Sequence, residues 1–152
     1  LQKLTQIKMK LLFLMVLRHP KERKNTHMNR QHSLKPTLSV DLKKKRIRIH
    51  KVTLHLLGDP EYIQLLVNPL NHTIALRKSI QEDYLAHRIR KEQLTGKNCY
   101  ELYSTDFVNT LCKVNTTWDE NEAYRIYGVF FQNEGLVSFD MNATIPLSKQ
   151  QE

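Results

Sequence analysis

Glycine, proline and cysteine are all scarce in this sequence, and each scarcity excludes a class of protein. Four glycines and five prolines among 152 residues are too few for a collagen-like or low-complexity chain. The glycines stand singly, so the chain has no phosphate-cradling loop and no dinucleotide-binding fingerprint. It also lacks a nucleophile elbow and a His-Glu-x-x-His motif. We therefore expect a protein that is not an enzyme and that needs no cofactor or metal.

Only two cysteines occur, and no partner cysteine or histidine stands near them at zinc-ligand spacing. We expect Cys99 and Cys112 to be free thiols, as in a cytoplasmic protein; a single disulfide is the alternative, in an oxidising compartment. Long apolar runs are also missing. The run Leu11–Leu17 resembles the core of a signal peptide, but it lacks a cleavage site, and a membrane span needs about 20 apolar residues.

What the sequence does contain is a strongly uneven charge. Residues 1–50 hold 14 Lys and Arg against two acidic residues, a net charge of +12, whereas residues 51–152 hold 10 against 13, a net charge of −3. A basic leading segment is thus joined to a mildly acidic body. Any polyanion that binds this chain is expected to bind near the front.

The first forty residues differ from the rest in pattern. Residues 18–40 show no sustained period of 2.0 or 3.6 residues, and they contain Ser33, Pro36 and Ser39, which are typical of a linker. The chain begins at Leu1 and not at Met, so Met28 is an alternative start. We expect 1–39 to be a basic, disordered or non-native extension, 40–146 to be the folded domain, and 147–152 to be a tail.

From Val40 onward one order of elements occurs twice. In the first copy, residues 43–77, Ile47 and Ile49 alternate with charged residues, which predicts a half-buried strand. A short helix should follow and end at Gly58-Asp59-Pro60, because glycine favours the left-handed residue after a helix and proline stops its continuation. The β-rich segments Tyr62–Val67 and Thr73–Leu76 then predict a hairpin.

The second copy, residues 98–141, repeats strand, helix, strand and strand. Tyr100–Tyr103 alternates like a strand, and Ser104 is placed as the N-cap of a helix. The segment 123–131, a turn at 132–135 and the segment 136–141 predict a second hairpin.

Between the copies, a linker helix is predicted over residues 79–95. Ser79 and Glu82 match a capping box, and apolar residues at Ile80, Tyr84, Leu85 and Ile89 follow helical spacing. The exposed side of this helix would be basic and solvated, with the residues His87, Arg88, Arg90 and Lys91.

The stretch Arg46–Gly58, followed by the hairpin Tyr62–Leu76, resembles the AbrB/SpoVT half-unit of bacterial transition-state regulators, and two tandem copies resemble the MraZ family. The resemblance implies an α+β, mostly β fold in which two βαββ half-units swap hairpins to form one pseudo-symmetric small barrel. It also implies a DNA-binding transcription regulator, with basic residues around the first strand as contacts. The family usually has glycine ahead of this strand and proline after it, where this chain has Lys45 and His50-Lys51.

A cluster of cations at the first strand is the candidate binding site. On a strand, Lys44, Arg46, Arg48 and His50 would share the outward side, opposite the inward Ile47 and Ile49. A row of cations suits the phosphates of double-stranded DNA, whose neutralisation releases counterions. The alternative is an edge strand that Lys and Arg protect from aggregation. The predicted DNA contacts are Lys43, Lys44, Lys45, Arg46, Arg48 and Lys51.

Two other functions stay open from the sequence. A protein-interaction module, antitoxin-like or a scaffold subunit of a mobile element, would use the same fold, and exposure of Tyr127, Phe130 and Phe131 would favour it. A hydrolase or metal enzyme would need a concave pocket that holds coupled titratable groups. The sequence predicts no small-molecule ligand, and it leaves open whether the chain forms a homo-oligomer.

Overall fold

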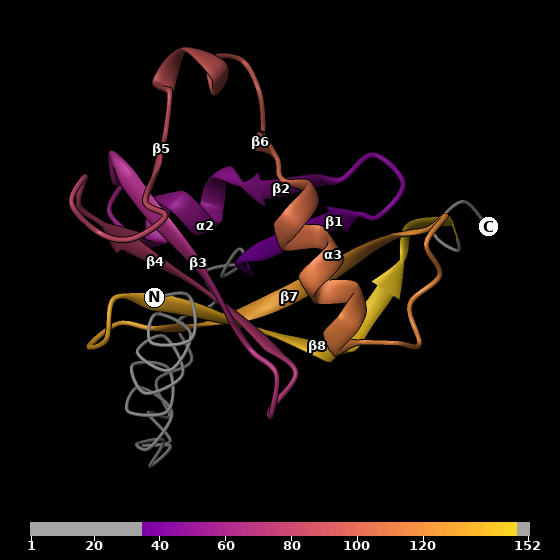
Figure 1. Ribbon diagram of the computed structural model, residues 1–152. Helices are drawn as coiled ribbons and strands as arrows, with labels where there is room; N and C mark the ends of the chain where they lie inside the picture. Colours follow the sequence, from indigo (N-terminus) through magenta and orange to yellow (C-terminus); the bar gives the residue numbers. More distant parts are fainter. Residues whose placement is uncertain (1–34, 149–152) are drawn as a thin grey trace, which may run out of the picture. The chain divides into compact units, whose positions relative to one another are not determined.

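The computed structural model describes residues 35–148, and within them the fold is mostly β with two α-helices and a short 3₁₀ helix (Figure 1). This confirms the predicted α+β, mostly β class. The strands are β1 (Thr37–Asp41), β2 (Arg46–His50), β3 (Tyr62–Asn68), β4 (Thr73–Ser79), β5 (His87–Arg88), β6 (Cys99–Tyr103), β7 (Ala123–Phe131) and β8 (Leu136–Pro146). The helices are α2 (Lys51–Leu56), η1 (Lys91–Gln93) and α3 (Thr105–Val114).

The eight strands form one antiparallel sheet in the order β5-β3-β4-β8-β7-β1-β2-β6. The sheet curls on itself like half of a barrel, and its two outermost strands, β5 and β6, are not paired with each other (Figure 1). The inward faces of all but β5 supply the core. The pairing of β4 with β8 joins the two hairpins β3-β4 and β7-β8.

The predicted elements of the first copy are present. Ile47 and Ile49 of β2 are fully buried, as the alternating pattern required. The helix α2 starts directly after β2, and Nδ1 of its N-cap His50 accepts a hydrogen bond of 3.4 Å from the backbone N–H of Val52. Gly58, at φ +83°, then turns the chain towards β3.

The predicted elements of the second copy are present as well. The Ser104 hydroxyl accepts a hydrogen bond of 3.2 Å from the backbone N–H of Phe107, so the predicted N-cap is confirmed. The hairpin β7-β8 is longer than predicted, because β8 continues beyond Met141 to Pro146. A register shift opposite Tyr127 places residues 140–143 of β8 in a bulge. The residues of β8 before this bulge and those after it both pair with β7.

The linker helix predicted over residues 79–95 is wrong. The carboxylate of Asp83, and not that of Glu82, closes a turn by accepting hydrogen bonds from the Ser79 hydroxyl at 2.6 Å and from the Ile80 N–H at 3.2 Å. Leu85 has φ +55°, which ends any helix. The chain then pairs with β3 as β5, because this pairing gives the otherwise unpaired edge of β3 a partner.

The predicted linker before Val40 is also wrong at its end. Leu38 and Val40 are fully buried, and β1 pairs with both β2 and β7. The alternation of apolar and polar residues extends over only five residues directly after a proline, which is too short to predict a strand. The remainder of the predicted extension, residues 1–34 with Met28, and most of the predicted tail, residues 149–152, lie outside the described residues.

The structure also bears on the expectations for the two cysteines and for a membrane span. Cys99 and Cys112 are free thiols, and their partial burial raises the pKa of both. Among residues 35–148, no helix is long and apolar enough to cross a membrane.

Candidate nucleic-acid interface

The turn between β1 and β2 carries Lys43, Lys44 and Lys45, called the turn cluster below. Asp41 holds this turn, because its Oδ1 accepts a hydrogen bond of 2.9 Å from the Lys44 N–H. Lys45 lies in the left-handed region at φ +52°, which redirects the chain into β2. Lys43 and Lys44 are exposed and Lys45 is half-buried, and none of the three forms an ion pair with any described residue. The turn cluster therefore presents uncompensated positive charge.

Arg46 and Arg48 are bound to carboxylates, unlike the lysines before them. The Arg46 guanidinium lies 3.3 Å from Asp41 Oδ2 and 3.5 Å from Glu101 Oε1, with only 13% of its side chain exposed. Arg48 Nε lies 2.8 Å from the same Glu101 oxygen. Arg46, Arg48 and His50 share the side of β2 opposite the buried Ile47 and Ile49, as predicted. Lys44 lies in the turn and not on this row, and both arginines are paired with acidic residues on the neighbouring strands. Their main work is to join β1, β2 and β6.

Lys51 lies at the opposite end of β2 from the turn cluster. Its backbone N–H donates a hydrogen bond of 2.7 Å to the carbonyl of Asn98, which places it beside the segment that leads into β6. The five residues of β2 correspond to about 17 Å at the usual rise of a strand. The six predicted contacts therefore divide into three groups: the turn cluster, the ion-paired Arg46 and Arg48 on β2, and Lys51 at the far end of the strand.

A second basic segment, residues 88–97, adjoins Lys51. Arg88, Arg90, Lys91 and Lys97 are all exposed, and only Arg88 has an ion-pair partner in the described part of the chain, Glu61 at 3.4 Å. The sequence placed three of these cations on a helix surface. They lie instead on β5, at the N-cap of η1 and on η1 itself. Lys97 lies on the connection between η1 and β6.

His87 adds no charge to this segment. Its ring packs edge-on against Tyr100, with Nε2 at 3.1 Å from the tyrosine hydroxyl. Burial against this ring, together with the nearby Arg90 guanidinium, lowers the pKa of His87 below its ordinary value. The imidazole is therefore neutral near pH 7.

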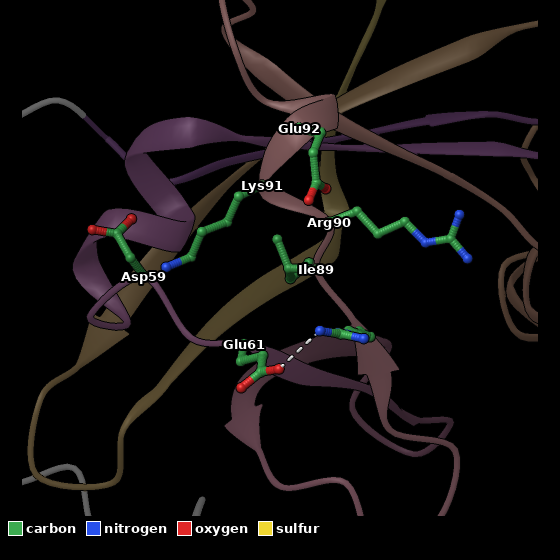
Figure 2. Close-up of a pocket in the computed structure, with 7 residues that line it drawn as sticks. Asp59, Glu61, Ile89, Arg90, Lys91 and Glu92 are labelled. Carbon is green, nitrogen blue, oxygen red and sulfur yellow. Dashed lines mark ion pairs between the residues drawn. The ribbon is translucent and has the colours of Figure 1, made fainter.

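A pocket of about 530 Å³ lies between this segment and the end of α2 (Figure 2). Its acidic and basic side chains balance, and Figure 2 shows Arg90 directed away from the others. No serine, cysteine or histidine lines it. Within residues 35–148, no three metal-binding side chains gather at a site. The lining residues are Asp59, Glu61, Arg88, Ile89, Arg90, Lys91 and Glu92.

Comparison of the chain with protein-family models, with curated proteins and with solved structures found no match. The resemblance to the AbrB/SpoVT and MraZ families therefore stays a prediction from the sequence.

The anchoring role of Asp41 can be measured directly. We expect Asp41→Ala to lower the free energy of unfolding by about 1–2 kcal/mol, because the Lys44 N–H and the Arg46 guanidinium both lose an acceptor. Urea denaturation gives this difference. Asp41→Asn is the matched control, since its side-chain oxygen can still accept from Lys44, and it should lose less. Equal stability of the alanine variant and the parent chain would contradict the anchoring role.

Proposed function

We propose that this chain binds double-stranded DNA and acts as a transcription regulator, without catalysing a reaction. The observation that carries the proposal is the turn cluster, where three consecutive lysines form no ion pair with any residue of the range 35–148, while the hydrogen bond from the Lys44 N–H to Asp41 holds the backbone of the turn in place. Each lysine that neutralises a phosphate releases a condensed counterion, so binding should be strong at low salt and fall steeply as salt rises. A regulator of this kind works in the cytoplasm, where the free thiols of Cys99 and Cys112 would persist.

The predicted arginines have a different place in this proposal. Arg46 and Arg48 brace the strands beneath the turn cluster, and their partner Glu101 would repel a phosphate that came close to the middle of β2. Lys43, Lys44, Lys45 and Lys51 are then the phosphate contacts. Such contacts position a duplex and give affinity without reading its sequence.

We further propose that the fold consists of two βαββ half-units related by an approximate twofold axis. Strand registers support this. Arg48 lies opposite Glu101 in the pairing of β2 with β6, and these residues are 53 positions apart, the same offset that separates the two predicted first strands. Ala75 lies opposite Ser138 in the pairing of β4 with β8. The two residues are equivalent, because each is the third residue after the turn of its own hairpin.

A reciprocal pair of backbone hydrogen bonds supports the same symmetry. The Lys51 N–H donates to the Asn98 carbonyl at 2.7 Å, and the Ser104 N–H donates to the Lys45 carbonyl at 3.0 Å. Adding 53 to Lys51 gives Ser104, and adding 53 to Lys45 gives Asn98. Each bond is therefore the symmetry equivalent of the other, as expected of two half-units that interlock along β2 and β6.

The DNA proposal is tested by removing charge from the turn cluster. In fluorescence anisotropy titrations with a labelled duplex over a range of salt concentrations, Lys43→Gln/Lys44→Gln should weaken binding and reduce the slope of log K against log salt by up to about 1.8, or 0.9 per lost contact. Lys78→Glu also lowers the net charge by two, but it lies on β4, away from β2 in the sheet. It is the matched control.

Binding by the double variant that equals binding by Lys78→Glu would remove the turn cluster from the interface. The same titration without any binding by the parent chain would overturn the proposal as a whole.

A protein-interaction module is the second candidate, favoured by the outer face of β7. Tyr127 is 43% exposed and Val129 is 61% exposed, so two apolar side chains on the same side of β7 face the solvent. Phe130, in contrast, packs against the core. If this face binds a partner protein, Val129→Asp should abolish capture of that partner and leave the anisotropy titration with DNA unchanged.

A further inference from the structure

We propose that residues 88–97 form the second half of the DNA interface, so that one chain presents two basic clusters to a single duplex. The second cluster is defined as Arg90, Lys91 and Lys97, together with the adjacent Lys51. This inference rests on the proposed DNA-binding function. It adds residues that the sequence assigned to a solvated helix surface.

The strand registers make residues 91–98 the counterpart of the turn that carries the turn cluster. β1 pairs with β7 of the second half-unit, and β5 pairs with β3 of the first. Each of these two strands then leads into β2 or β6, the two strands that pair with each other. Residues 42–45 form the first connection, and residues 89–98 form the second, of which 91–98 correspond to 42–45. The approximate twofold axis therefore exchanges the two connections.

The second cluster carries free positive charge, as the turn cluster does. Arg90, Lys91 and Lys97 are exposed, and none of them forms an ion pair with the residues that the structure describes. Lys51 is also exposed and without an ion-pair partner in this part of the chain. Asp59, Glu92 and the Glu61–Arg88 ion pair line the pocket together with Arg90 and Lys91, so the charges within the pocket balance. Lys51 and Lys97 do not line this pocket, and they give the cluster its surplus of positive charge.

The backbone of the segment is anchored at both ends. The Ile89 side chain is buried in the core, and its N–H donates a hydrogen bond of 2.8 Å to the Glu61 carbonyl. The Tyr100 hydroxyl donates to the Arg88 carbonyl at 3.3 Å. At the other end, the carbonyl of Asn98 accepts the hydrogen bond from Lys51. A segment held in this way loses little backbone entropy when it binds a polyanion, which favours affinity.

The separation of the two clusters suits one duplex. The two clusters flank β2, whose five residues span about 17 Å at the rise of a strand. Phosphates follow one another at about 3.4 Å of helix axis along each strand of DNA, so the two clusters would contact phosphates about five or more base pairs apart. The ion-paired Arg46, Arg48 and Glu101 lie between the clusters. Phosphate contacts are therefore expected at the two ends of β2 and not at its centre.

The test removes charge from the second cluster of the full chain. We expect Lys91→Gln/Lys97→Gln to weaken binding of a labelled 20-base-pair duplex several-fold at about 0.1 M salt and to reduce the salt slope by up to about 1.8. Lys113→Glu, in the last turn of α3, lowers the net charge by the same two units and is the matched control. Lys91→Arg/Lys97→Arg keeps both charges and should bind like the parent chain, which separates a lost contact from a disturbed fold.

The outcomes distinguish this inference from the proposed function. Two clusters that both contact DNA predict that Lys43→Gln/Lys44→Gln and Lys91→Gln/Lys97→Gln each reduce the salt slope, and that the quadruple variant loses about the sum. If only the turn-cluster variant reduces it, and the second-cluster variant behaves like Lys113→Glu, the inference is overturned while DNA binding stands. A parent chain that does not bind the duplex would overturn both.

Discussion

Replacing Phe139 with alanine is expected to lower the free energy of unfolding by about 3–5 kcal/mol. Phe139 is fully buried on β8, the strand that joins the two hairpins, and it pairs with Ile74 of β4 on one side and Gly128 of β7 on the other. Removal of the ring leaves a cavity under the middle of the sheet, where neighbouring strands restrict the relaxation that would fill it. Urea denaturation followed by circular dichroism measures the loss.

A milder substitution keeps this prediction measurable if the alanine variant does not fold. Phe139→Leu retains most of the apolar volume and should cost clearly less than Phe139→Ala. Ser138→Ala is the control one residue away, because Ser138 points to the other face of the sheet and is only half-buried. A cost for Phe139→Ala no larger than that for Ser138→Ala would mean that the inward face of β8 is assigned incorrectly.

The elements with a strong period or a definite stop signal were predictable from the sequence. Alternation of Ile47 and Ile49 predicted β2, the glycine after the helix predicted the end of α2, and Ser104 predicted the start of α3. These signals are local, since each depends on a few neighbouring residues. The two hairpins followed from β-rich runs on both sides of a turn.

Elements that exist only through tertiary pairing were not predictable in the same way. The apolar residues Ile80, Tyr84 and Leu85 have helical spacing, but all three are exposed, and no partner surface buries them. Of the predicted stripe, only Ile89 enters the core, and it does so because β5 pairs with β3. Helical spacing stabilises a helix in water mainly when its apolar face is buried, and here that condition fails.

The candidate site shows the same limit. The sequence placed the lysines of the turn cluster at the start of the first strand, and the structure places them in the turn just before it. It did not reveal that Glu101, 53 positions from Arg48, would lie opposite it and bind it. The offset of 53 between the two copies was the one signal that anticipates this pairing. Applied to charged residues as well as to apolar ones, the offset would also have made Lys97 and Asn98 the counterparts of Lys44 and Lys45 in the turn cluster.

Replacing Gly128 with valine is expected to lower the free energy of unfolding by about 1–3 kcal/mol through overpacking. A Cβ atom at this position would lie 2.7 Å from Cε1 of Phe139 and 2.7 Å from Cγ1 of Val137, both closer than side chains approach each other. The backbone of Gly128 is not in the left-handed region, so space alone excludes a side chain there. Gly135, in the β7-β8 turn, has no atoms within 4 Å of a built Cβ, although its φ of +61° favours glycine.

A double-mutant cycle identifies which neighbour excludes a side chain at position 128. Gly128→Ala should be destabilising in the parent chain, but it should cost clearly less in the Phe139→Leu background, because two of the three close contacts are with the Phe139 ring. The remaining contact, with Val137, predicts that relief is partial and that Val137→Ala in addition would complete it. If the costs of Gly128→Ala and Phe139→Leu were simply additive, the strands β7 and β8 would have to separate locally to admit the methyl group. The pairing of Gly128 with Phe139 would then be lost, while the packing of the neighbouring side chains is kept.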